Sequence, residues 1–170
     1  MSSTGTRLEL DDARELAWAF VEAHCVGGRV EIVGSIRRRK ETVGDIELLL
    51  HRDTQLVGVD ADYGEESMFP STAAYQWIKR GEKYGQLLHK ARGYKIDLFR
   101  ADDDNWGSIM LIRTGPSDFS ARWVTALKQR GTPSAGGYIR DKDGAVIPCR
   151  DEAMAFQLTG WDYIEPESRC

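Results

Sequence analysis

Residues 29–51 read RVEIVGSIRRRKETVGDIELLLH, and the predicted fold is built around this stretch. Its first five residues form a short segment rich in β-branched side chains, which predicts a strand that stops at the Gly34-Ser35 turn. Four consecutive basic residues follow at 37–40. A second strand is predicted over 45–51, where alternation sends apolar even-numbered residues to one face and Asp45 and Glu47 to the other. Two neighbouring carboxylates therefore point the same way.

Helices and further strands are predicted on both sides of this stretch. Apolar residues recur at helical spacing from Leu10 to Val21, with the helix end expected near Gly27-Gly28. Residues 52–76 are interpreted as an irregular connection, with a helix expected near 72–79. Two more strands are expected over 84–91 and 94–100, and the second carries Asp97 on the face opposite to Ile96. A third carboxylate thus joins the predicted sheet.

The C-terminal part of the chain is predicted to form a smaller unit. Helices are expected over 106–112 and 119–127, separated by Thr114-Gly115-Pro116, which is the expected subdomain boundary. Beyond residue 132, short strand-like pieces occur near Tyr138 and Val146, and a helix is expected over 151–158. The chain is therefore predicted to be an α+β protein, with a mixed β-sheet backed by helices and a small α+β appendage.

Composition places the chain among ordinary globular proteins. Its 170 residues are 41% hydrophobic and 29% charged, with a formal net charge of −4 at pH 7. No apolar run approaches the ~18 residues of a spanning helix, and the cysteines lack CxxC spacing. We expect a soluble, intracellular, monomeric protein with reduced thiols and no membrane partner. Positive charge is concentrated locally, because residues 78–100 hold seven basic residues against two acidic ones.

The same stretch has the residue types of a phosphate site beside a metal site. Gly34 lets a polyphosphate approach the backbone, Ser35 can donate to a phosphate oxygen, and Arg38 can add a charge-assisted contact. Mg²⁺ prefers carboxylate and phosphate oxygens, so Asp45 and Glu47 form a suitable clamp. Asp97 can complete a two-metal arrangement for nucleotidyl transfer. Alternate acids on a strand often form only its solvent face, but the joint pattern favours the chemical interpretation.

Together these motifs resemble those of the family X DNA polymerases, the DNA polymerase beta family of the nucleotidyltransferase superfamily. The family pattern of Gly-Ser, two arginines and Gly-Asp-x-Asp is similar to Gly34-Ser35-Ile36-Arg37-Arg38 and Gly44-Asp45-Ile46-Glu47. The third family carboxylate resembles Lys95-Ile96-Asp97, and the Thr-Gly turn between palm and thumb resembles Thr114-Gly115. The closing segment is similar to Gly137-Tyr138, the helix over 151–158 and Tyr163-Ile-Glu-Pro-Glu-Ser-Arg169. The resemblance covers residues 8–170.

The resemblance implies a nucleotidyltransferase palm over residues 1–113 and a thumb over 114–170. It implies template-directed addition of dNMP from dNTP to a primer 3′-OH at short gaps or nicks in DNA, as in repair. It also implies a minimal enzyme without a lyase domain, with a virus-encoded protein of the host cytoplasm or nucleus as one option. By resemblance, Asp45, Glu47 and Asp97 are the catalytic residues and hold two Mg²⁺ ions, for which Mn²⁺ can substitute. The implied nucleotide-binding residues are Gly34, Ser35, Arg38, Gly44, Thr114 and Gly115.

Two departures from the family pattern keep other functions open. Ile112-Arg113 stands where the family has an aromatic pair that helps to exclude ribonucleotides. This departure and the net negative charge of the chain are both compatible with a template-independent nucleotidyltransferase that acts on RNA, protein or a small molecule. Glu47 replaces the usual second Asp, which is compatible with a non-catalytic DNA-binding relative. Dependence of base choice on a template strand separates the polymerase from the template-independent transferase. Failure to bind Mg-nucleotide would favour the non-catalytic relative.

Overall fold

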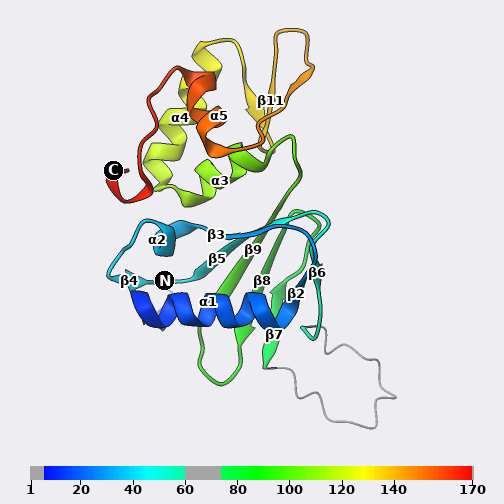
Figure 1. Ribbon diagram of the computed structural model, residues 1–170, viewed down its shortest axis with the longest axis vertical. Coiled ribbons are helices and arrows are strands. Elements are labelled where there is room, and N and C mark those ends of the chain that lie inside the picture. The colour runs from blue at the N-terminus through cyan, green and yellow to red at the C-terminus, as the bar shows by residue number, and fades with distance from the viewer. Residues whose placement is uncertain (1–5, 60–73, 170) are drawn as a thin grey trace.

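A five-stranded central sheet with helices on both sides organises the structure (Figure 1). The computed structural model describes residues 6–59 and 74–169. The sheet contains β3 (Val30–Ile32), β5 (Ile46–His51), β7 (Tyr75–Lys79), β8 (Tyr84–His89) and β9 (Lys95–Ala101). The spatial order is β3-β5-β9-β8-β7, in which β5 and β9 are parallel and the other neighbours antiparallel. The predicted α+β class and mixed sheet backed by helices are confirmed.

The two faces of the sheet pack against different helices. Ile46, Leu48 and Leu50 are fully buried in a core that includes Ala17 and Phe20 of α1 (Leu10–His24). Burial of each such Leu or Ile side chain contributes about 1.5–3 kcal/mol. The opposite face buries Leu49 and Phe99 against Trp106 and Met110 of α3 (Trp106–Thr114). Because side chains alternate along a strand, the odd-numbered acids of β5 and β9 lie on the α3 side.

Short elements fasten α1 along the sheet. The strand β1 (Leu8–Glu9) precedes α1 and pairs with β4 (Thr42–Val43), which lies just before β5. The strand β2 (Cys25–Val26) follows α1 and pairs with β6 (Gln55–Leu56), which lies after β5. A single helical turn, α2 (Gly34–Arg37), links β3 to β4. Both ends of α1 are therefore tied to the chain on either side of β5.

The C-terminal unit packs around its own apolar cluster. It contains α4 (Ser117–Gln129), β10 (Ser134–Ala135), β11 (Tyr138–Arg140), β12 (Val146–Ile147), α5 (Glu152–Thr159) and the 3-10 helix η1 (Pro166–Ser168). Phe119, Trp123 and Phe156 are buried together with Leu111 of α3. Since α3 also packs on the central sheet, it joins the two layers seen in Figure 1.

The helix predicted near 72–79 is wrong. Residues 75–79 form the edge strand β7, paired with β8, while residues 72 and 73 lie outside the described residues. Tyr75 packs edge-on against Phe20 of α1 at 5.2 Å between ring centroids, and Gln76 and Ile78 point outward. Alternating aromatic residues suit a half-buried strand, which overrides the weak local helical pattern.

In the part of the chain that the structure describes, no helix has the length and hydrophobicity to cross a membrane.

Candidate active site

Three carboxylates lie on the α3 side of the central sheet. Asp45 directly precedes β5, Glu47 lies within β5, and Asp97 lies within β9. Because β5 and β9 run parallel with Glu47 and Asp97 as register partners, these two side chains share a face. Asp45 lies just outside the strand, and the charge of Asp97 acts on it, which places it near that face as well. The structure thus brings the three sequence-predicted carboxylates together, and they form the acidic face of the sheet.

Burial and mutual repulsion act on the acidic face. Burial raises the pKa of Asp45, and the charge of Asp97 raises it further. Burial and the charge of Asp97 also raise the pKa of Glu47 to about 7, against the opposing effects of the Ser35 N–H, Arg38 and Arg113. Burial and the charge of Asp97 therefore both disfavour the ionised forms of Asp45 and Glu47. A divalent cation relieves this kind of repulsion.

Stability is expected to depend on pH through Glu47. In the folded protein this carboxyl binds its proton more tightly than in the unfolded chain, where its pKa is 4.5. Its contribution to stability is therefore fully present below pH 4.5 and is lost as the pH rises through about 7. We expect Glu47→Gln to increase the free energy of unfolding at pH 8 in EDTA by an amount on the order of 2 kcal/mol.

Thermal unfolding followed by circular dichroism at pH 4 and pH 8 measures this effect. The difference between Glu47→Gln and the wild type should be absent at the lower pH. Glu22→Gln, at an exposed position of α1, is the control and should change neither midpoint. Equal unfolding midpoints of wild type and Glu47→Gln at both pH values would contradict the role of Glu47.

The turn at Gly34 and Ser35 holds the carboxylate of Glu47. Gly34 has φ +67°, in the left-handed region that favours glycine, and a Cβ on it would collide with that carboxylate. The backbone N–H of Ser35 donates to Glu47. The turn predicted to bind phosphate therefore contacts an anionic oxygen of the protein itself. Gly44 lies next to Asp45, and the described residues leave open space where its Cβ would stand.

Arg38, Thr114 and Gly115 meet at the end of α3. The Arg38 guanidinium donates to the carbonyl oxygen of Thr114, and a Cβ on Gly115 would lie 3.3 Å from Arg38 Nη1. Burial lowers the pKa of Arg38, which the nearby Glu47 opposes. The Nε atom of Arg38 is buried and has no hydrogen-bond partner within residues 6–59 and 74–169. A spare guanidinium donor beside the turn suits an oxygen of an anion such as phosphate.

Two residues that sequence reasoning missed hold Asp97. The Tyr84 hydroxyl donates to Asp97 Oδ1 at 2.8 Å, and Gln86 Nε2 donates to the same oxygen at 2.7 Å. Burial, followed by the hydrogen bond to Asp97 and the charges of Asp97 and Asp45, raises the pKa of Tyr84 to about 12. Its hydroxyl is therefore a donor at neutral pH. The signal that could have pointed to these two residues is the alternation of the predicted strand 84–91, which places residues 84 and 86 on one face.

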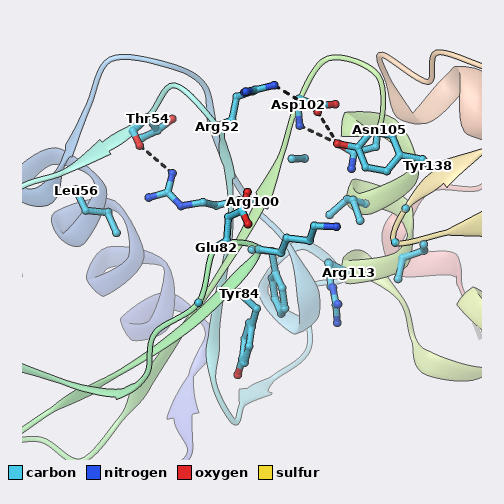
Figure 2. A pocket seen from close by; sticks show the side chains of 18 of the residues that line it. Arg52, Thr54, Leu56, Glu82, Tyr84, Arg100, Asp102, Asn105, Arg113 and Tyr138 are labelled. Carbon is cyan, nitrogen blue, oxygen red and sulfur yellow. Dashed lines mark hydrogen bonds and ion pairs between the residues drawn. The ribbon is translucent and has the colours of Figure 1, made fainter. Parts of the chain in front are cut away.

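A cleft of about 950 Å³ opens between the central sheet and the turn that leads into β11 (Figure 2), and none of the three carboxylates is among the described residues that line it. Its lining includes the cations Arg52, Lys83, Arg100 and Arg113 and the acids Glu82 and Asp102. Asp102 is engaged, because it accepts a 2.6 Å hydrogen bond from Tyr138 and lies 3.8 Å from Arg52. Tyr84 and Arg113 connect the cleft to Asp97 and Glu47 respectively. The cleft is therefore a basic hollow that adjoins the acidic face.

The basic residues of segment 78–100 do not form one continuous stripe. Lys79, Arg80 and Lys83 lie at the turn between β7 and β8. Lys90 and Arg92 lie in the turn between β8 and β9. The 6 residues of β8 separate these turns, a length of about 20 Å. Folding into hairpins therefore divides the charge, and the first group lies on the side of the cleft.

The side chains of the acidic face provide the type of ligand that Mg²⁺ prefers, because carboxylate oxygens are hard donors. The three side chains do not form a complete coordination site for a metal ion. Within the described ranges 6–59 and 74–169, no three His, Cys, Asp or Glu side chains are grouped closely enough to hold a metal ion. Glu47 is bound to Ser35, and Asp97 is bound to Tyr84 and Gln86. Asp45, Glu47 and Asp97 are the residues that would hold such ions.

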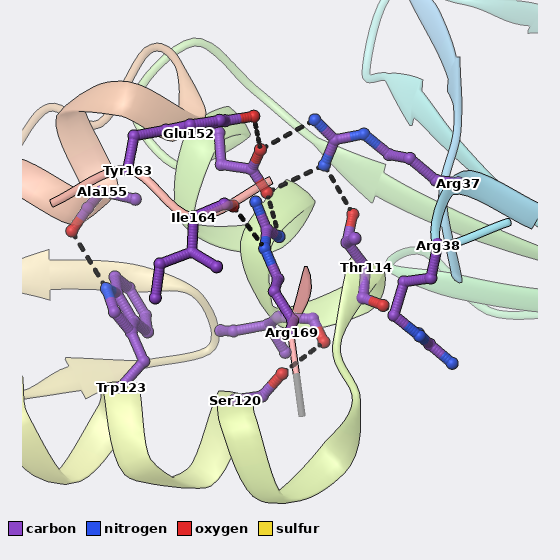
Figure 3. Close-up of polar contacts among 11 residues, drawn as sticks. Arg37, Arg38, Thr114, Ser120, Trp123, Glu152, Ala155, Tyr163, Ile164 and Arg169 are labelled. Carbon is purple, nitrogen blue, oxygen red and sulfur yellow. Dashed lines mark hydrogen bonds and ion pairs between the residues drawn. The ribbon is translucent and has the colours of Figure 1, made fainter. Parts of the chain in front are cut away.

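A buried polar cluster joins α2 to the C-terminal unit (Figure 3). Arg37 donates to the two carboxylate oxygens of Glu152 at 2.8 and 2.7 Å and to Thr114 Oγ1 at 2.8 Å. Arg169 donates to Glu152 at 2.7 Å, and the Tyr163 hydroxyl donates at 3.1 Å. Burial opposes ionisation of Glu152, but the hydrogen bonds and charges of Arg37 and Arg169 hold its pKa below the ordinary value. The cluster fixes α2, and with it Arg38.

No protein-family model and no curated protein matches the chain.

Proposed function

We propose that this protein is a template-directed DNA polymerase that adds dNMP from dNTP to a primer 3′-OH at short gaps or nicks in DNA. The observation that carries the proposal is the meeting of Asp45, Glu47 and Asp97 on one sheet face, beside the buried spare donor of Arg38. Residues 1–113 would be a nucleotidyltransferase palm and residues 114–170 a thumb. This is the arrangement of the family X polymerases, which the sequence motifs resemble.

The proposed reaction moves one proton and exchanges one phosphorus–oxygen bond. The primer 3′ oxygen attacks the α-phosphorus of dNTP, the bond from that phosphorus to the bridging oxygen breaks, and pyrophosphate leaves. Asp97 accepts the proton of the 3′-hydroxyl. Two Mg²⁺ ions, or Mn²⁺, bound by the three carboxylates would neutralise charge on the phosphates and make the hydroxyl more acidic. The raised pKa of Glu47 and of Asp45 supports a site whose charge balance includes such cations.

Neighbouring groups suit the two substrates. Arg38 Nε and the Ser35 hydroxyl would donate to triphosphate oxygens, and the open space at Gly44 leaves the backbone there accessible. At Gly34 the Glu47 carboxylate occupies that space and would have to move away first. Thr114 and Gly115, next to Arg38, would lie under the sugar. The cations of the adjoining cleft would bind DNA phosphates, a contribution that weakens as salt concentration rises. The nucleotide and the DNA would thus meet where the cleft adjoins the acidic face.

Primer extension on DNA with a single-nucleotide gap tests the proposal. Each of the four dNTPs is supplied separately with Mg²⁺, opposite each template base. We expect addition of only the complementary nucleotide, with release of pyrophosphate. Addition regardless of the template base would favour a template-independent nucleotidyltransferase, the alternative that Ile112 and Arg113 at the cleft motivate. If neither Mg²⁺ nor Mn²⁺ supports addition, the proposal is overturned in favour of a non-catalytic DNA-binding relative.

A further inference from the structure

Asp97 of the acidic face receives two side-chain hydrogen bonds from neutral donors. The Tyr84 hydroxyl and Gln86 Nε2 both donate to Oδ1, at 2.8 and 2.7 Å. Both donors come from β8, which pairs with β9 in an antiparallel ladder where Gln86 is the register partner of Asp97. Two bonds to one oxygen fix the rotation of the carboxylate, and within residues 6–59 and 74–169 no side-chain hydrogen bond engages the other oxygen, Oδ2.

The Tyr84 donor is itself held in place. The Tyr84 ring stacks on Phe99 with centroids 5.2 Å apart and planes inclined by 23°. The ammonium group of Lys79 lies 4.9 Å from the centroid of the same ring. Phe99 in turn is buried against α3, and the guanidinium of Arg113 lies over its ring, 4.1 Å from the centroid. The hydroxyl of Tyr84 is therefore aimed by aromatic packing.

Orientation matters at this position because Asp97 faces like charges. Glu47 is its register partner on the same face of the sheet, so an unrestrained Asp97 carboxylate would lower the repulsion between the two charges by turning away. Tyr84 and Gln86 prevent that rotation without adding a positive charge, which would compete with a bound cation. The hydrogen-bond partners of a ligating carboxylate commonly contribute about 10–100-fold to metal affinity or activity.

We propose that Tyr84 and Gln86 are positioning residues that hold Asp97 Oδ1 so that Oδ2 faces the cation and the primer 3′-hydroxyl. This inference rests on the proposed polymerase function and names two residues that the sequence motifs do not include. Tyr84 and Gln86 act through Asp97 and touch no reacting atom. Their removal should therefore lower the rate of the chemical step and the affinity for the cation, and leave dNTP binding nearly unchanged.

Tyr84→Phe and Gln86→Leu, singly and combined, test this inference in the full-length chain. The phenylalanine keeps the ring that stacks on Phe99 and removes only the hydroxyl. We expect each single variant to lower kcat for gap filling by about 10-fold and to weaken Mn²⁺ binding, measured by EPR of free Mn²⁺, by a similar factor. KM for dNTP should stay within about 2-fold, because the triphosphate groups are untouched. The double variant should lose less than the product of the single losses, because both bonds serve one oxygen.

Tyr75→Phe is the matched control. It removes a tyrosine hydroxyl that pairs with Tyr94 at 3.1 Å, in the core that the same sheet forms with α1. It should change neither kcat nor Mn²⁺ affinity. Wild-type kcat and Mn²⁺ affinity in both Tyr84→Phe and Gln86→Leu would overturn the inference.

The Mn²⁺ measurement separates this inference from the proposed function. If the wild type adds no nucleotide but Mn²⁺ binding is weakened in the two variants and not in Tyr75→Phe, the polymerase proposal fails and the positioning of Asp97 stands. If the wild type adds no nucleotide and Mn²⁺ binding is equal in all variants, both are overturned.

Discussion

Asp97→Asn should abolish nucleotide addition and leave the fold intact. The amide keeps a carbonyl oxygen that can accept the hydrogen bonds from Tyr84 and Gln86, so the local geometry persists. The charge that binds a cation and the oxygen that accepts the 3′-hydroxyl proton are both lost. We expect the rate of single-nucleotide gap filling to fall at least about 1,000-fold.

The same substitution should not destabilise the protein. The charge of Asp97 raises the pKa of Asp45 and of Glu47, so its removal relieves repulsion on the acidic face. The midpoint of thermal unfolding at pH 8 in EDTA should therefore equal or exceed that of the wild type.

Single-turnover incorporation and thermal unfolding are measured on the same preparations. Asp103→Asn, at an exposed acid beside His51, is the control and should retain full activity. An Asp97→Asn variant that keeps its activity within about tenfold of wild type would remove Asp97 from the catalytic group.

Glu152→Ala should cause a large loss of stability. Glu152 is 4% exposed and accepts hydrogen bonds from Arg37, Tyr163 and Arg169. Its removal leaves Arg169, itself 3% exposed, without its carboxylate partner. A buried cation that loses its partner lowers the free energy of unfolding by about 3–5 kcal/mol. Because Arg37 belongs to α2, the turn that carries Ser35 and Arg38 also loses a support.

Glu167→Ala is the matched control for this loss. Glu167 pairs with Arg39 at 3.5 Å and joins the same two parts of the chain, the segment after α2 and the C-terminal end. The two side chains are 40% and 64% exposed, so the pair contributes less than about 1 kcal/mol. Urea unfolding at pH 7 measures both variants. Equal losses of unfolding free energy in Glu152→Ala and Glu167→Ala would show that burial of the Arg37–Glu152–Arg169 cluster adds nothing to stability.

The contribution of Glu152 should also disappear in acid. Its pKa is lowered in the folded protein, so the stability it provides is present above its ordinary pKa of 4.5 and is lost as the pH falls through the lower folded value. This dependence is opposite in sign to that of Glu47. Comparing Glu152→Ala with wild type in urea at pH 3 and pH 7 should give a smaller difference at the lower pH.

Local patterning was enough to predict the elements that carry the carboxylates. The strand over 45–51 and the strand containing Asp97 follow from period-two alternation, and their pairing places the acids on one face. The same reasoning failed at residues 75–79, where packing of Tyr75 against Phe20 and pairing with β8 determine the strand. Tertiary contacts of this kind outweigh the propensity of a short segment.

The contacts that support the site lie beyond local patterning. Arg37 and Glu152 are 115 residues apart in the sequence, and Arg37 and Thr114 are 77 apart, so no spacing rule pairs them. Tyr84 and Gln86 have the alternation of a strand, but their register against Asp97 is set by the β8–β9 turn. Counting charges along 78–100 predicted one local concentration of positive charge, whereas the hairpins place those residues at both ends of β8. The residue types of the site were therefore predictable, and the groups that orient them were not.

A crystal structure with gapped DNA, a non-hydrolysable dNTP analogue and Mg²⁺ is the decisive test of the proposed active site. We predict Mg²⁺ between the triphosphate and the carboxylates of Asp45, Glu47 and Asp97, with Arg38 Nε and the Ser35 turn on phosphate oxygens. We also expect Glu47 to leave the Ser35 N–H on binding. A triphosphate bound elsewhere, for example among Arg52, Lys83 and Arg100 in the cleft, with no ion at the three carboxylates, would contradict the proposed active site.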